Sequence, residues 1–339
     1  MRTILLADKA HRNYHAIDFF RVFSDSILDE LNGLGIGLES EPVFLEEFDR
    51  KRSLLRETDI LLSNWGMPEL TLEQVAEYLP RVRAVFYAGG DVRPFAAPYF
   101  QRGARVFSTG HANAVPASEY ALAQILMANK GTQRNLRLYR DEETYVQSRE
   151  RSTALPGNYR ATVGILGVGR VGSRLAKLLK GFDLKVYGCD PFLPPHLASE
   201  LGLEMVEAEE LFALCDTVSC HLPEWSTLRG YVTEDLLLSM PENASFINAA
   251  QASVVDQEGL IRALIARPDL TAILDSTDPM PLPALHPLLT LPGAIVTPHT
   301  AGSFGGETER MGEEIVSALR DYLSGTPSIH EIHRERVPE

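Results

Sequence analysis

The chain has 339 residues, of which 45% are hydrophobic, and this length suits two ordinary domains that each bury their own core. Its 46 acidic residues outnumber its 32 basic residues, and the formal net charge of −14 disfavours nucleic acid and anionic membranes as partners. No apolar run approaches the length of a membrane span, no signal-peptide pattern opens the chain and its 3 cysteines form no C-x-x-C pair, so we expect a cytoplasmic protein.

The first hundred residues alternate short apolar runs with helical patterns. Helical patterns cover residues 19–31 and 72–79, and the runs that read as strands are 4–7, 60–63, 84–87 and 106–108. This alternation is typical of parallel strands joined by crossover helices. The segment up to residue 108 is therefore predicted to be a small α/β unit.

A helix is expected to start within residues 114–119. Pro116 suits a first-turn position there, and Glu119 lies near the positive end of the helix dipole. Apolar residues then fill nearly every side over 120–127, which predicts a helix buried within the protein or against another subunit. The charged stretch 134–151 is expected to be a solvated face or a linker.

The stretch 162–190 carries the most specific pattern in the chain. An apolar run ends at Gly167, Gly169 and Gly172, which have G-x-G-x-x-G spacing. A helical pattern follows, and a second apolar run ends at Asp190. Glycines also gather in ordinary structural turns, but here the strand, the helix and the distal acid appear together. We therefore predict a dinucleotide-binding turn.

Each part of this motif has a physical role. Gly167 permits a tight turn, Gly169 lets the backbone approach a pyrophosphate, and Gly172 lets the helix and strand pack closely. The helix that opens at Arg170 and Val171 points unpaired N–H groups at the phosphates. Asp190 is placed to accept hydrogen bonds from the ribose hydroxyls. No Arg follows it to bind a 2′-phosphate, so NAD is favoured over NADP.

Further strands are expected after the glycine turn. These strands are 218–220, 245–247, 272–274 and 295–297. Together with the strands at 162–166 and 185–189 they make six, the number of strands in a full dinucleotide-binding sheet. A last helix should return to the first unit, because apolar residues recur every four positions at Met311, Ile315, Leu319 and Leu323.

Several short motifs follow one another along nearly the whole chain. They are Asn113-Ala114, the glycine turn with Asp190, His221-Leu222-Pro223, Ile247-Asn248-Ala249-Ala250, Val254-Val255-Asp256, Leu274-Asp275 and Thr297-Pro298-His299-Thr300-Ala301-Gly302. In this order they resemble the D-isomer-specific 2-hydroxyacid dehydrogenase family, which includes glycerate, lactate and phosphoglycerate dehydrogenases.

The resemblance implies an architecture. It implies an α/β fold of two Rossmann-like or flavodoxin-like domains with parallel sheets. An NAD-binding domain of residues 110–300 would be inserted into a substrate domain of residues 1–109 and 301–339, with the active site in the cleft between them. The long helix after Pro116 would hold a homodimer.

The resemblance also implies roles for single residues. His299 would be the catalytic acid–base, a task that suits the pKa of His. Asp275 would hold the nicotinamide carboxamide, and the backbone of Ala249 and Ala250 would line the nicotinamide. His221 and Pro223 would lie beside the cofactor. The backbone of Ala88, Gly89 and Gly90 would donate hydrogen bonds to the substrate. No metal site is predicted.

Two positions depart from the family pattern. Gln251 stands where the family has the catalytic Arg, and Met280 stands where a common variant of the acid loop has Glu. A neutral amide forfeits charge-assisted hydrogen bonds worth about 1.5–3 kcal/mol. Loss of the carboxylate would leave the tautomer of His299 unfixed. We expect an ordinary 2-keto acid to be handled about 10²–10⁴ times more slowly.

Other residues offer compensation, each with a plainer alternative. Asp278 could reach His299, or it could simply form an Asp-Pro turn. Arg93 could supply the missing cation, or it could be a solvated or structural residue. Glu224 and Trp225 replace residues that usually follow the His-x-Pro motif and indicate a different substrate shape.

Two functions are consistent with this pattern. The first is an NAD-dependent oxidoreductase that acts on a hydroxy or keto compound other than a simple small 2-keto acid, such as a less anionic polyol or sugar-derived compound. The alternative is a catalytically impaired NAD(H)-binding sensor or interaction protein that keeps the fold and the cofactor site.

Overall fold

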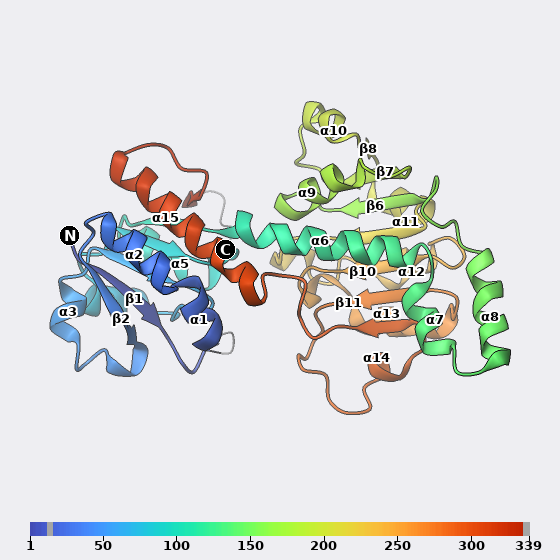
Figure 1. The fold of residues 1–339 in the computed structure, drawn as a ribbon, viewed down its shortest axis with the longest axis horizontal. Coiled ribbons are helices and arrows are strands. Elements are labelled where there is room, and N and C mark those ends of the chain that lie inside the picture. The colour runs from blue at the N-terminus through green and yellow to red at the C-terminus, as the bar shows by residue number, and fades with distance from the viewer. Residues whose placement is uncertain (12–15, 335–339) are drawn as a thin grey trace. The chain divides into compact units, whose positions relative to one another are not determined.

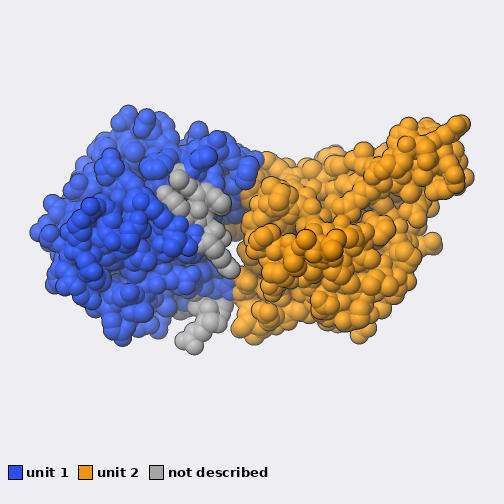
Figure 2. Space-filling model, turned by 90° about the horizontal axis from the view of Figure 1, so that it is seen from below, with its two compact units in different colours: residues 1–113, 303–339 blue, residues 114–302 orange. Residues whose placement is uncertain are grey.

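The computed structural model describes residues 1–11 and 16–334, and the chain forms two compact units (Figures 1 and 2). Unit 1 comprises Met1–Asn113 and Ser303–Glu339, and unit 2 comprises Ala114–Gly302. The chain passes between the units inside helix α6 (Gly110–Ala128) and again after Gly302. Within the described residues, no helix is both long and apolar enough to cross a lipid bilayer.

Unit 1 is built on a six-stranded sheet of order β13-β5-β4-β3-β1-β2. Its strands are parallel except for β13, which pairs antiparallel with β5. Without β13 the order is that of flavodoxin-like folds. The strands are β1 (Thr3–Ala7), β2 (Leu38–Phe44), β3 (Ile60–Ser63), β4 (Ala84–Tyr87), β5 (Arg105–Ser108) and β13 (Glu331–Ile332).

The four strands expected in this segment are present, and β2 and β13 were missed. Glu39, Ser40 and Glu41 of β2 are exposed, so this edge strand has no apolar run that a sequence pattern could show. The two residues of β13 are too few for any periodicity. The helix expected over 19–31 forms as two helices, and Ser24 lies at the N-cap position of the second.

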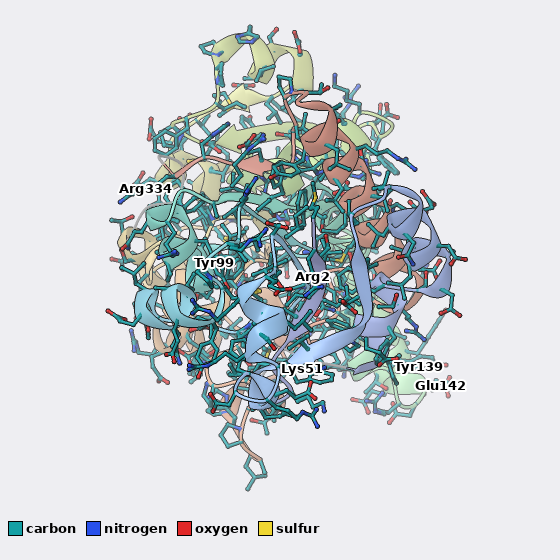
Figure 3. All side chains as sticks on the ribbon, turned by 90° about the vertical axis from the view of Figure 1, so that its left-hand side faces the viewer. Arg2, Lys51, Tyr99, Tyr139, Glu142 and Arg334 are labelled. Carbon is teal, nitrogen blue, oxygen red and sulfur yellow. The ribbon has the colours of Figure 1, made fainter. Side chains whose placement is uncertain are left out.

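Helices cover both faces of this sheet (Figure 1). Leu5 packs on one face with Leu31 and Ile315, and Ile4 packs on the other with Val75. Tyr99, labelled in Figure 3, is completely buried. The helices are α1 (Ala16–Val22), α2 (Asp25–Gly33), α3 (Arg52–Arg56), α4 (Leu72–Tyr78), α5 (Arg93–Gln101) and α15 (Glu309–Ser324), with 3₁₀ turns η1 (Leu45–Glu47) and η4 (Gly305–Thr308).

Unit 2 contains a seven-stranded, all-parallel sheet of order β12-β11-β10-β9-β6-β7-β8. This is the order typical of a dinucleotide-binding sheet with one added strand. The expectation of six strands was wrong, because the two-residue edge strand β8 gives no apolar run. The strands are β6 (Thr162–Leu166), β7 (Lys185–Cys189), β8 (Glu204–Met205), β9 (Thr217–Cys220), β10 (Ser245–Asn248), β11 (Thr271–Leu274) and β12 (Ala294–Val296).

Helices also cover both faces of the unit 2 sheet. Ile125 of α6 and Leu175 of α9 pack on one face with Ile165, and Phe212 and Leu260 pack on the other with Phe246. The other elements are α7 (Thr132–Leu138), α8 (Glu142–Thr153), α9 (Arg170–Leu179), α10 (Pro195–Leu201), α11 (Ala208–Leu214), α12 (Glu234–Leu238), α13 (Gln257–Ala266) and α14 (Pro287–Thr290), with η2 (Ser226–Leu228) and η3 (Ala252–Val254).

Helix α6 begins earlier in the chain than predicted. It begins at Gly110, so that Pro116 lies inside it, and the Ala112 N–H donates both to the Thr109 carbonyl and to the distant Glu314 carboxylate, each at 3.0 Å. Within one chain its apolar stretch is buried at Ala121 and Ile125 and only partly covered at Leu122 and Leu126, so burial of the remainder against another subunit stays a prediction. The charged segment 134–151, expected to be a solvated face or a linker, forms most of α7 and α8, and the mostly exposed α8 matches the solvated-face alternative.

Candidate functional site

The glycine turn connects β6 to α9 at the carboxyl end of the unit 2 sheet (Figure 1). Gly167 has a φ of +88°, and a Cβ there would also lie 2.9 Å from the His221 carbonyl group. A Cβ on Gly172 would collide with the Gly167 carbonyl oxygen. At Gly169, the N-cap of α9, a Cβ would meet open space. A larger residue therefore does not fit at Gly167 or Gly172, whereas the space beside Gly169 is open.

Asp190 lies beside this turn at the end of β7. Its Oδ2 accepts a hydrogen bond from the Val168 N–H at 2.8 Å, and its Oδ1 accepts one from the Phe192 N–H at 2.9 Å. The first N–H groups of α9, at Arg170 and Val171, have no preceding carbonyl within the helix. The structure thus places a carboxylate next to backbone donors and the positive end of a helix dipole.

The loop after β9 borders the glycine turn on its other side. The His221 N–H donates to the Leu166 carbonyl at 2.7 Å, and His221 Nε2 lies 2.9 Å from the Ser219 hydroxyl. Packing of protein around the ring lowers the pKa of His221 to about 4, so its imidazole is neutral near pH 7. The carbonyl of the exposed Pro223 accepts the Trp225 N–H at 2.9 Å.

His299 lies in an exposed loop after β12. Asp275, buried at the end of β11, binds residues on both sides of it. Its Oδ1 accepts from the Thr297 hydroxyl at 2.6 Å and from the Thr300 N–H at 2.8 Å, and its Oδ2 accepts from the Ala301 N–H at 2.8 Å. His299 itself has a φ of +58°, a left-handed conformation that is uncommon outside glycine. The imidazole is therefore presented from a fixed loop.

Tyr120 extends this network to helix α6. Its hydroxyl lies 2.8 Å from the Thr297 hydroxyl, and burial raises the pKa of Tyr120. Neither Tyr120 nor Thr297 was predicted to be a site residue, although Thr297 ends a predicted strand and opens the motif that contains His299.

The loop after β10 carries Gln251. Asn248 fixes its path, since Asn248 Oδ1 accepts from the Ala250 N–H at 3.2 Å and Nδ2 donates to the Gln251 carbonyl at 3.3 Å. The Ser276 hydroxyl donates to the Ala250 carbonyl at 2.6 Å. This leaves the Gln251 side chain exposed on a loop joined to the one that begins at Asp275.

No carboxylate of unit 2, all of which is described, pairs with the His299 imidazole. Met280 is 54% exposed. Asp278 faces Arg229 at 3.9 Å, and its N–H donates to the Gln257 side chain at 3.0 Å. These contacts favour the turn-forming alternative for Asp278.

In unit 1, the loop after β4 was expected to offer backbone donors. The N–H groups of Ala88 and Gly89 already donate to the Ser63 and Tyr87 carbonyls at 2.8 and 2.9 Å. The Gly90 N–H has no such acceptor among the described residues of unit 1. Arg93 donates to both carboxylate oxygens of Asp91, which favours the structural alternative for its guanidinium.

Comparison with known proteins agrees with this geometry. Residues 122–301, more than half of the chain, match the family model described as "D-isomer specific 2-hydroxyacid dehydrogenase, NAD binding domain". The chain belongs to this family. Unit 2 is accordingly its NAD-binding domain, and the glycine turn with Asp190 fits that cofactor because it combines open space, backbone donors and a carboxylate.

A curated protein of known sequence is similar to this chain over part of its length. A D-3-phosphoglycerate dehydrogenase of Mycobacterium tuberculosis is 30% identical over 229 residues, which cover 66% of this chain and 42% of that protein. The chain thus spans about two fifths of the length of such curated relatives.

Solved structures share the two-unit fold over nearly the full chain. The apo form of D-mandelate dehydrogenase from Rhodotorula graminis has a TM-score of 0.80 at 20% identity and covers 98% of both chains. The TT0316 protein from Thermus thermophilus has a TM-score of 0.72 at 23% identity and covers 98% of this chain and 100% of that one. At these identities the likeness establishes the fold.

Proposed function

We propose that this 2-hydroxyacid dehydrogenase family member is an NAD-dependent oxidoreductase that interconverts a hydroxy and a keto group, with His299 as its acid–base. The observation that carries the proposal is the Asp275 clamp, which holds the residues on both sides of His299 and exposes the imidazole. A histidine held in this way is suited to exchange a proton with a substrate oxygen.

The cofactor-binding roles follow from the fixed loops around the sheet edge. The N–H groups of Arg170 and Val171 would face the pyrophosphate and Asp190 would bind the ribose, while the backbone of Ala249 and Ala250 would line the nicotinamide. Asp275 Oδ2 has accepted one N–H and retains capacity for the carboxamide. NAD, when bound, supplies the hydride acceptor.

The substrate is proposed to carry less negative charge than a small 2-keto acid. The exposed Gln251 amide can donate to a carbonyl or hydroxyl oxygen, but it offers no charge to a carboxylate. The Gly90 N–H would be a second, neutral donor to the substrate. A polyol or sugar-derived hydroxy compound matches this set of neutral donors.

A homodimer completes the proposal. Helix α6 is only partly covered at Leu122 and Leu126. The next helices in the chain, α7 and α8, expose several large apolar side chains. These are Leu136, Tyr139, Tyr145 and Val146, and Figure 3 labels Tyr139 together with Glu142 at the start of α8. A cytoplasmic location is part of the same proposal, since the 3 cysteines are free and buried.

The test is turnover of a panel of hydroxy acids, sugar acids and polyols, followed through NADH absorbance. His299→Ala should lower kcat about 10²–10⁴-fold and leave the Kd for NAD unchanged, because its side chain acts on the substrate. His196→Ala, an exposed histidine on α10, is the matched control and should keep full activity. Turnover that is equal in the His299→Ala protein and the unaltered one would contradict the proposal.

A second function, NAD(H) binding without turnover, is favoured by the neutral Gln251 and Met280 and by the lack of a carboxylate at His299 in unit 2. It predicts nucleotide binding with no activity on any member of the panel. A Gln251→Arg, Met280→Glu double variant would then gain 2-keto acid reduction, because it restores both charges. Ordinary turnover by the unaltered protein would exclude this function.

A further inference from the structure

Two aromatic side chains meet across the end of β6. Strands β7 and β9 flank β6 on opposite sides, and Phe192 and Trp225 belong to the loops that follow them. The two ring centroids are 6.1 Å apart with an interplanar angle of 69°, an edge-to-face contact. The pair therefore bridges the loops on both sides of the glycine turn.

The backbone under each ring is fixed. The Phe192 N–H donates to Asp190 Oδ1 at 2.9 Å, and the Trp225 N–H donates to the Pro223 carbonyl at 2.9 Å. Glu224, next to Trp225, accepts the Ser253 hydroxyl at 3.0 Å. The Phe192 side chain nevertheless remains 76% exposed, and neither ring belongs to a hydrophobic core of unit 2.

We propose that Phe192 and Trp225 clasp the adenine ring of the cofactor between them. The inference rests on the proposed function, which places the adenosine ribose on Asp190. A base attached to that ribose must lie within a few ångströms of Phe192, because the same carboxylate binds the Phe192 backbone. Aromatic side chains stack on nucleobases through the π-faces that every base offers.

The geometry requires only a small rearrangement. A base sandwiched between two rings needs a ring separation of roughly 7–8 Å, which is two contacts of about 3.5–4.0 Å each. The observed 6.1 Å edge-to-face pair must therefore open slightly and turn one ring. Side-chain rotation supplies this motion while the anchored backbone stays in place, so the pair covers the adenine site until a nucleotide enters.

Binding experiments on the full chain test the clasp. Isothermal titration with ADP-ribose should show about a tenfold increase in Kd for Trp225→Leu and for Phe192→Leu, because each variant loses one stacking surface. The Kd for nicotinamide mononucleotide, which has no adenine, should not change. Tyr159→Leu is the matched control, since this exposed tyrosine precedes β6 at the opposite edge of the sheet.

Tryptophan fluorescence provides an independent readout. The chain has 2 tryptophans, Trp65 and Trp225, so Trp65→Phe leaves Trp225 as a single reporter. AMP and ADP-ribose should quench it, and nicotinamide mononucleotide should not.

The outcomes separate the clasp from the function on which it rests. Failure of the unaltered protein to bind NAD or ADP-ribose would overturn the proposed function. Normal binding that both leucine variants retain would overturn only the clasp. A variant that lowers the melting temperature without changing any Kd would also overturn the clasp, because the rings would then only stabilise the loops. So would a variant that weakens the binding of nicotinamide mononucleotide as much as that of ADP-ribose, because the rings would then face the nicotinamide.

Discussion

At the scale of single residues, the Asp275 carboxylate determines how His299 is presented. The resemblance to the family assigned Asp275 to the nicotinamide, and the structure adds that it binds the backbone at Thr300 and Ala301. Both N–H groups would be left without an acceptor if the carboxylate were lost. An unsatisfied buried donor costs about 1–3 kcal/mol, so Asp275 stabilises the fold of the His299 loop in addition to its proposed contact with the cofactor.

Asp275→Asn is expected to lower the free energy of unfolding by about 1–3 kcal/mol, since the amide nitrogen cannot accept a hydrogen bond. It should also lower kcat at least tenfold because the His299 loop loosens. Urea unfolding and steady-state kinetics measure both effects. Asp278→Asn is the control and should change neither; a loss of activity in that variant would show that Asp278 serves His299 after all.

His221 gives the protein a pH-dependent stability. Its pKa is lowered to about 4 in the folded state, so between pH 6.5 and 4 the unfolded chain binds a proton that the folded chain does not. We expect unfolding free energy to fall over this range by up to about 3 kcal/mol from this residue. In His221→Gln, chemical denaturation at pH 7 and pH 4.5 should show a smaller loss; an equal loss would contradict this account.

At the scale of elements, the β6–α9 turn separates two uses of glycine. A Cβ at Gly172 would strike the Gly167 carbonyl oxygen, which is backbone and cannot move aside cheaply, whereas a Cβ at Gly169 meets nothing. The same motif therefore contains one position required by the fold and one that only a bound pyrophosphate would require.

Gly172→Ala and Gly169→Ala should consequently behave differently. Gly172→Ala is expected to destabilise unit 2 by about 1–3 kcal/mol, as overpacking does. Gly169→Ala should keep the melting temperature within about 1–2 °C, since surface changes cost little, but raise the Kd for NAD at least tenfold. Calorimetric melting and NAD titration check both. A Gly169→Ala protein that binds NAD normally would show that no phosphate approaches this backbone.

At the scale of the whole molecule, the exposed apolar side chains of α7 and α8 are the surface that a second copy would cover. Leu136 lies within α7, and its side chain is 67% exposed. Single exposed leucines are ordinary, but this one has Tyr139 and Tyr145 nearby in sequence, with the two tyrosine rings 5.5 Å apart.

Leu136→Glu is expected to convert a dimer into a monomer at micromolar concentration, because it places a charge in an apolar interface. Light scattering coupled to gel filtration measures the mass. Ile265→Glu, at a similarly exposed position on α13, should leave the dimer intact. An unaltered protein that elutes with the mass of one chain would remove the homodimer from the proposal.

Features that depend on a local pattern could be predicted from the amino-acid sequence. Strands buried on both faces, such as β4 and β6, appear as unbroken apolar runs, and the G-x-G-x-x-G spacing with Asp190 predicts the turn without any distant contact. The family and its NAD domain followed from short motifs of the same kind.

Features that depend on partners far away in the chain could be seen only in the folded structure. Glu314 reaches the first turn of α6 from α15, the edge strands β2 and β8 pair with a neighbouring strand, and Phe192 meets Trp225 across β6. The roles of Asp278 and Arg93 were left open for the same reason. A side chain's hydrogen-bond partner is set by which loops the sheet brings together, and no local pattern records that.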